Sequence, residues 1–158
     1  MKHLFCLTLA FLLTSAGNAQ LASPNESGVT FGHVHLNVSD IEEHKRIWVD
    51  HFNGTIVDRG SHSVIKLPNM MITLAEQTPT MDSIETAMHH FGFKVRRMDR
   101  FLDKWRAAGL KVGSMFLGAE GQLNAYVTLP DGVEVEMQED QGLQEEITGY
   151  HVHWFVDN

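Results

Sequence analysis

Apolar and polar residues alternate along residues 31–38, FGHVHLNV, and this period of two predicts a β-strand with two different faces. One face is apolar and suits packing against a core, whereas the other carries two histidines and an asparagine. The apolar face consists of Val34, Leu36 and Val38, and the polar face of His33, His35 and Asn37.

A helical pattern follows in residues 39–54, SDIEEHKRIWVDHFNG. Ser39 or Asp40 is expected to cap the start of the helix, and Gly54 is expected to end it. The stripe predicted to face the core consists of Ile41, Lys45, Trp48 and Phe52. Short strands are then expected within residues 55–60, 63–68 and 70–75. The unit is therefore a strand, a helix and three further strands.

The same order recurs in the second half of the chain. An alternating strand is expected at 89–95 and a helix at 97–109, and Gly109 is expected to end that helix. The strands that follow are predicted around 110–113, 115–117, 125–130 and 133–137. We interpret the order as a tandem duplication of a βαβββ module, at 31–76 and 89–137. The expected fold is α+β, with the two modules forming an open, cup-shaped mixed sheet and the helices packed outside.

The end of the sequence repeats its first strand. HVHWFVDN at 151–158 matches HVHLNVSD at 33–40 in the spacing of its histidines and valines. We favour the interpretation that residues 150–158 begin a third module of a larger, four-module protein. The acidic segment 138–149 would then be the linker between the paired modules. The alternative is that the tail forms a single extra strand.

The first residues are typical of an export signal. A short basic start is followed by an apolar run at 4–13, which is too short to span a bilayer, and by small residues that favour cleavage after Ala19. We therefore predict a signal peptide at 1–19, a flexible leader at 20–30 and a secreted or periplasmic protein, with an uncleaved anchor as the alternative. The only cysteine, Cys6, lies in the signal, so the mature chain is expected to lack disulfides and thiolate sites.

The charge balance limits the possible partners. Twelve lysine and arginine residues stand against twenty aspartate and glutamate residues, a formal net charge of −8. Nucleic acids and anionic membrane surfaces attract basic proteins, so neither is expected as a partner. A small-molecule substrate is the remaining expectation.

Strand parity predicts where metal-binding chemistry could gather. His33 and His90 stand at equivalent positions on the polar faces of the two modules' first strands, and Glu136 lies on the polar face of the last strand. Two imidazoles and one carboxylate suit Fe, Mn, Zn, Ni or Co as divalent ions. We predict that these three residues bind the ion. The alternative is that they line a cavity that binds no metal.

Other polar residues on these faces are candidates for roles beside the ion. His35 is a candidate for proton transfer or a cavity-lining residue, and Tyr126 is a candidate acid or a core aromatic residue. Asn37, Lys94 and Glu134 are candidates for substrate binding. The remaining histidines outside the repeated strands are expected to face solvent: His44, His51 and His62.

Three segments together resemble the vicinal oxygen chelate superfamily, which includes glyoxalase I, fosfomycin and bleomycin resistance proteins, methylmalonyl-CoA epimerase and extradiol dioxygenases. They are HVHLNVSDIEEHKRIWVDHFNG, HFGFKVRRMDRFLDKWRAAGLKV and YVTLPDGVEVEM, and the resemblance covers residues 31–137. It implies metal ligands at His33, His90 and Glu136. It also implies a substrate that chelates the ion through two neighbouring oxygens.

One departure from that family narrows the expected activity. Members similar to glyoxalase I carry a further glutamate on the last strand of the first module, where this chain has Thr73 or Leu74. The expectation is therefore a three-ligand enzyme, a metal-dependent lyase, isomerase or dioxygenase, which could pair as a homodimer or with a second domain. The alternatives are a non-catalytic protein that binds a ligand, as bleomycin resistance proteins do, and a metal-free first barrel of a longer protein. In the longer protein His151 would be a ligand of the other barrel.

Overall fold

The computed structural model describes residues 23–60 and 62–156, so the predicted signal peptide at 1–19 lies outside the described residues. Within these ranges no helix is long and apolar enough to cross a membrane. The first module consists of β1 (His33–Val38), α1 (Ile41–Phe52), β2 (Thr55–Arg59), β3 (His62–Leu67) and β4 (Met70–Glu76). Its sheet has the order β1-β4-β3-β2, with β1 parallel to β4 and the other pairs antiparallel.

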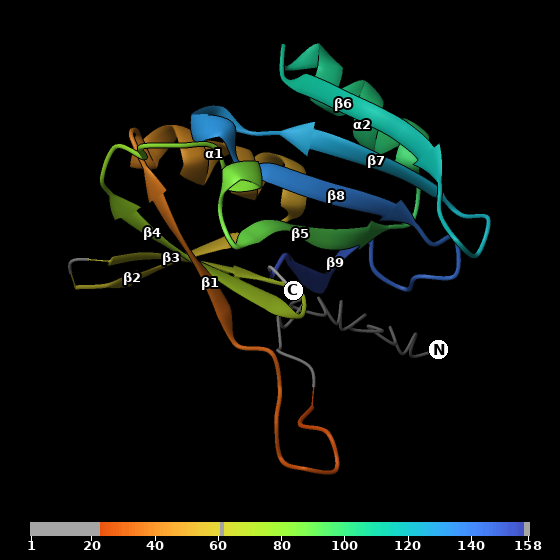
Figure 1. Cartoon of the computed structure of the whole chain (residues 1–158), viewed down its shortest axis with the longest axis horizontal. Helices are drawn as coiled ribbons and strands as arrows, with labels where there is room; N and C mark the ends of the chain where they lie inside the picture. Colours follow the sequence, from red (N-terminus) through yellow and green to blue (C-terminus); the bar gives the residue numbers. More distant parts are fainter. Residues whose placement is uncertain (1–22, 61, 157–158) are drawn as a thin grey trace, which may run out of the picture.

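The second module has the same order of elements and of paired strands. It consists of β5 (Met88–Val95), α2 (Met98–Ala107), β6 (Lys111–Leu117), β7 (Leu123–Thr128) and β8 (Glu134–Glu139). Short 3₁₀ turns at Ser83–Glu85 and Pro130–Gly132 precede β5 and β8. The α+β fold of two βαβββ modules predicted from the sequence is confirmed. The strands form two open sheets, of which the second has the order β6-β7-β8-β5-β9 (Figure 1).

The extra strand β9 (Ile147–Trp154) is the tail that repeats β1 in sequence, and it pairs antiparallel with the free edge of β5 (Figure 1). Two hydrogen bonds tie it to the first module: the Gly149 amide donates to the Pro68 carbonyl at 2.8 Å, and Asn69 Nδ2 donates to the Gly149 carbonyl at 3.0 Å. The segment predicted as a linker, 138–149, contributes its first two residues to β8 and its last three to β9. Only 140–146 connect the two strands.

One hydrophobic core joins the modules. The fully buried Trp48 and Phe52 of α1 contact aromatic rings of β5, with ring centroids 6.0 Å apart for Trp48 and Phe91 and 5.0 Å apart for Phe52 and Phe93. Phe52 also packs edge-on against Trp105 of α2 at 5.9 Å. Burying large aromatic side chains is a leading stabilising term in a domain of this size. The helix of the first module is therefore part of the core of the second.

The ends of α1 agree only partly with the sequence prediction. Asp40 is the N-cap, and its Oδ1 accepts from the Glu43 amide at 2.9 Å. At the other end the left-handed residue is Asn53, with φ of 57°, whereas Gly54 was expected there. Position 54 needs a glycine because there is no room for a side chain: a β-carbon would lie 2.6 Å from Ile65 Cγ2 and 2.8 Å from the Trp48 carbonyl oxygen.

The prediction that His44 faces solvent is wrong. His44 is fully buried with Ile47 and Trp48 on the inner face of α1, and its Nε2 lies 3.3 Å from Asp131 Oδ2. Asp131 also accepts a hydrogen bond from the Ser39 amide at 2.7 Å. Asp131, in the turn between β7 and β8, therefore provides a polar partner for the buried His44. The apolar pattern of the helix by itself predicts that His44 is exposed.

Candidate metal centre

A cluster of one carboxylate and two imidazoles lies on the polar side of the second sheet. His90 of β5, Glu136 of β8 and His151 of β9 each offer a ligand atom, and these atoms all lie within 4.8 Å of one another. His90 and Glu136 are buried, whereas His151 is partly exposed. The burial pattern of β5 follows the predicted parity, because Phe91, Phe93 and Val95 face the core and leave the other side to the cluster.

The distances from the two imidazoles to Glu136 fit a divalent ion. His90 Nε2 lies 3.0 Å and His151 Nε2 lies 3.4 Å from the same carboxylate oxygen, Glu136 Oε2. Two ligands about 2.1 Å from one ion are about 3.0 Å apart at a right angle and about 3.4 Å apart at the tetrahedral angle. Because two nitrogens and one oxygen on the open side of a sheet leave further positions for water or substrate, the donor set also suits a catalytic ion.

Gly92 is what allows His151 to lie against β5. A β-carbon at this position would be 2.3 Å from Cε1 of the His151 ring and 2.8 Å from its Nδ1. Gly92 is paired with His151 across the antiparallel β5–β9 ladder and with Glu136 across the parallel β5–β8 ladder. The missing side chain therefore leaves the space that the imidazole occupies.

Hydrogen bonds keep Glu136 ionised. Contacts with His151 and His90, together with a 2.6 Å hydrogen bond from Asn124 Nδ2 to Oε1, hold the pKa of Glu136 well below its usual range, against the opposing effect of burial. Asn124 is itself buried on β7 and orients the carboxylate from the side away from the two imidazoles. An ionised carboxylate with a fixed orientation is the form that binds a cation.

Tyr126 faces the cluster from β7. Its hydroxyl lies 3.4 Å from Glu136 Oε2, and its ring meets the His90 ring edge-on with centroids 5.2 Å apart. Burial, with the nearby negative charge of Glu136, raises the pKa of Tyr126 to about 12. The phenol therefore stays protonated at neutral pH and can donate a hydrogen bond to an oxygen beside Glu136.

Two further histidines surround His90. Nδ1 of His89 lies 2.8 Å from Nδ1 of His90, and Nδ1 of His153 lies 3.3 Å from Nε2 of His90. Loss of solvation lowers the pKa of His89, with smaller contributions from His90 and His153, so the neutral ring can accept a hydrogen bond from the Nδ1–H of His90. Such a hydrogen bond would leave His90 Nε2 free to bind an ion beside Glu136.

The structure brings together two of the three predicted ligands. His33 lies on the exposed polar face of β1, and it lines a separate pocket of about 290 Å³ with His35, Arg59 and His62. The rings of His33 and His35 are 4.7 Å apart. That His33 is a metal ligand and that His35 transfers protons both stay predictions.

Of the predicted substrate-binding residues, only Glu134 lies close enough to the surroundings of the cluster to act on the pKa of Tyr126 and of His89. Asn37 is exposed on β1. Nζ of Lys94 forms an ion pair with Asp140 Oδ2 at 3.0 Å and lies over the Tyr150 ring. Glu134 accepts a hydrogen bond from Thr128 at 3.0 Å. None of these contacts connects the three residues to the cluster, and their role in substrate binding stays a prediction.

The sequence carried a signal for His151 that the predicted ligand set did not use. The match between HVHWFVDN and HVHLNVSD marks His151 as the equivalent of His33. Strand parity alone could not show that the tail pairs with β5 of its own chain. The antiparallel register, with bulges between Met88 and His90 and between Gly92 and Phe93, decides that contact.

Comparisons with known proteins agree with this fold. The family model of the Glyoxalase/Bleomycin resistance protein/Dioxygenase superfamily matches residues 30–137. No individual curated protein matches the sequence.

Solved structures of similar fold share little sequence. The fosfomycin resistance protein FosX from Listeria monocytogenes is 17% identical with a TM-score of 0.60, and the match covers 76% of this chain and 94% of the FosX chain. Lactoylglutathione lyase from Agrobacterium tumefaciens is 18% identical with a TM-score of 0.55, and the match covers 71% of this chain and 94% of the lyase chain. A glyoxalase family protein from Enterococcus faecalis is 20% identical with a TM-score of 0.57, covering 68% and 94%. With the family model matching more than half of its length, the chain belongs to the Glyoxalase/Bleomycin resistance protein/Dioxygenase superfamily.

Proposed function

We propose that this protein is a divalent-metal-dependent enzyme that acts on a small substrate whose two neighbouring oxygens chelate the ion. The observation that carries the proposal is the meeting of His90 Nε2 and His151 Nε2 at one oxygen of Glu136, at 3.0 and 3.4 Å. His90, Glu136 and His151 would hold the ion. When bound, the ion would supply a Lewis acid that polarises the substrate oxygens.

The surrounding residues have roles that follow from their chemistry. Asn124 fixes the orientation of the Glu136 carboxylate, and His89, by accepting from the Nδ1–H of His90, would select the tautomer of His90 that leaves Nε2 for the ion. The protonated Tyr126 hydroxyl can donate to a substrate oxygen placed beside Glu136. The exposed imidazole of His153, 3.3 Å from His90, can exchange a proton with solvent at the rim of the cluster.

Cobalt substitution tests the metal site without an activity assay. Co²⁺ bound by two imidazoles and a carboxylate should give visible absorption bands that are lost in Glu136→Gln, a variant of the same shape. Glu145→Gln is the matched control, because Glu145 is an exposed glutamate in the segment between β8 and β9, and this variant should leave the spectrum unchanged. If Glu136→Gln binds cobalt as the unmodified protein does, the assignment of the site is wrong.

Chelation by the substrate has its own probe. Acetohydroxamate offers two neighbouring oxygens and acetamide offers one, so only the first should shift the cobalt bands at millimolar concentration. Equal responses to both compounds would contradict bidentate binding. Turnover of a metal-loaded protein on a panel of hydroxyketones, epoxides and catechols would then separate an isomerase or lyase from a dioxygenase, and an absence of turnover would indicate a protein that only binds its ligand.

We also propose that the chain is exported, which rests on the signal-like pattern of residues 1–19. Mass spectrometry of the protein recovered outside the cytoplasm of an expression host should find Gln20 as its first residue. Recovery with Met1 in the cytoplasm alone would contradict export.

A further inference from the structure

Basic residues are concentrated in one short part of this acidic chain. Six of its twelve lysine and arginine residues fall between positions 94 and 106, although the formal net charge is −8. They are Lys94, Arg96, Arg97, Arg100, Lys104 and Arg106. Four of these positions belong to α2 or to the residue that caps it, so the positive charge gathers along one helix.

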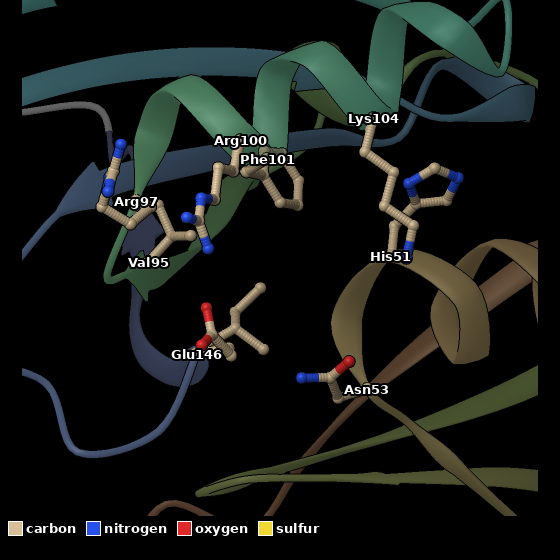
Figure 2. Close-up of a pocket in the computed structure, with 9 residues that line it drawn as sticks. His51, Asn53, Val95, Arg97, Arg100, Phe101, Lys104 and Glu146 are labelled. Atoms are coloured by element: carbon tan, nitrogen blue, oxygen red, sulfur yellow. The ribbon is translucent and has the colours of Figure 1, made fainter.

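Three of these side chains line a pocket between the helices of the two modules. Arg100 points into it from α2, Lys104 extends from the same helix, and Asn53 borders it at the end of α1, whereas the Arg97 guanidinium is directed away from it (Figure 2). The pocket has a volume of about 170 Å³. Pockets for drug-sized ligands are usually about 300–1,000 Å³, so this one suits a small ion or a single functional group.

Two of the three cations form no ion pair with a described residue, although Asp99 interacts with Arg100 at longer range. Arg97 forms an ion pair with Asp99 at 2.6 Å. In contrast, the Arg100 side chain has no ion pair or hydrogen bond with the part of the chain that the structure describes. Lys104 Nζ donates to the backbone carbonyl of Asp50 and forms no ion pair with a described residue.

The single carboxylate in the pocket wall does not cancel this charge. Glu146 is already paired with Arg96, and Arg96 also donates to the Gln144 carbonyl at 3.2 Å. The pocket wall therefore carries three cationic side chains, of which Arg97 is paired with Asp99, and one carboxylate, which is paired with Arg96. The local potential should be positive, opposite to that of the whole chain.

The pocket is separate from the candidate metal centre. Val95 of β5 borders it on the helix side of the sheet (Figure 2). His90 faces the other side, towards Glu136. Successive residues of a strand point to opposite faces, so a full sheet thickness lies between the two sites. An ion in one site would not contact the other.

We propose that this pocket binds a small oxyanion of phosphate size. The Arg100 guanidinium can donate two parallel hydrogen bonds to neighbouring oxygens, and the Lys104 ammonium supplies a second positive charge. The Asn53 side-chain amide at the pocket wall adds a neutral donor (Figure 2). Arg100 and Lys104 come from the second module and Asn53 from the first, so the bound anion would bridge the two modules.

The test is a titration of the metal-free protein with inorganic phosphate, followed by amide NMR shifts at constant ionic strength. Saturable shifts should map to the amides around Asn53 and from Arg97 to Lys104. The shifts of the His90 and Glu136 amides should be small. Large shifts there would indicate that phosphate binds at the candidate metal centre instead. Sodium chloride at matched ionic strength should give no saturable shift.

Variants decide which side chains bind the anion. Arg100→Gln and Lys104→Gln should each weaken phosphate binding by about tenfold, since each removes a charge-assisted contact. Arg106→Gln is the matched control, because Arg106 lies on the same helix but interacts with Asp103 and Met115 outside the pocket, and its affinity should be unchanged. Shifts that map to β5 and β8, shifts that chloride reproduces, or full affinity in Arg100→Gln would each overturn the proposal.

Discussion

The imidazole ring of His151 lies so close to Gly92 that a β-carbon there would be 2.3 Å from its Cε1. A glycine in the interior of a strand usually weakens the strand, so its presence beside the cluster suggests that the space is needed. Gly92 pairs with His151 across the β5–β9 ladder, and the position of the His151 ring depends on the missing side chain.

Replacing Gly92 should therefore displace the histidine. Gly92→Ala is expected to push the His151 ring away from Glu136 and to lower the affinity for Zn²⁺ by about tenfold or more, the scale typical of disturbed metal sites. Isothermal titration with Zn²⁺ measures the change. Gly32→Ala is the control, because a β-carbon at Gly32 would meet nothing within 4 Å and its φ is not positive. Unchanged zinc affinity in Gly92→Ala would show that His151 is not a ligand.

Ionised Glu136 should stabilise the metal-free fold in a pH-dependent way. Its pKa is lower in the folded chain than in the unfolded chain, where a glutamate has a pKa of about 4.3. The unfolded state therefore binds more protons at acidic pH, so the contribution is complete above about pH 5 and is lost as the pH falls through the unfolded pKa towards the folded pKa.

Urea unfolding from pH 7 to pH 3 in the presence of a chelator measures this contribution. The difference in the free energy of unfolding between the unmodified protein and Glu136→Gln should be constant above about pH 5 and should decrease below it. The same comparison with the exposed Glu145→Gln should give a much smaller pH dependence. A difference that grows as the pH falls would contradict the assigned direction.

Asp131 joins the modules through an unusual backbone conformation. Its φ is 60°, its Oδ2 accepts from the Ser39 amide, and the same oxygen lies 3.3 Å from the buried His44. Asp131→Ala should destabilise the fold by about 2–3 kcal/mol, because alanine tolerates this conformation poorly and leaves both partners without an acceptor. Thermal unfolding measures the loss.

Asp131→Asn separates the two causes. Asparagine tolerates a positive φ and keeps one acceptor oxygen, so it should cost less than Asp131→Ala, about 1 kcal/mol. If both variants were as stable as the unmodified protein, the Ser39–Asp131–His44 contact would not contribute to holding the modules together.

The alternation of residues was sufficient to predict most of the fold. The period of two placed Val34, Leu36 and Val38 inside, and the helical period placed Trp48 and Phe52 in the core, because burial of one face decides each pattern. Contacts between distant segments cannot be predicted from the local pattern of apolar and polar residues. Asp131, which makes a buried position acceptable for His44, stands 87 residues further along the chain.

The candidate site was predictable to the same extent. Parity and repeat position identified His90 and Glu136, which lie on adjacent strands of one module. The third ligand, which is the second imidazole, depends on which strand pairs with the free edge of β5, and two segments of nearly the same sequence, around His33 and His151, could occupy that edge. Only the three-dimensional arrangement distinguishes them.

The most direct test of the central claim is therefore the metal content of two histidine variants. Purified protein loaded with Zn²⁺ and dialysed should retain one ion per chain by plasma mass spectrometry. His151→Ala should lose it and His33→Ala should retain it, with circular dichroism confirming that both variants are folded. Retention by His151→Ala together with loss by His33→Ala would contradict the site of His90, Glu136 and His151, as would an unmodified protein that retains no ion.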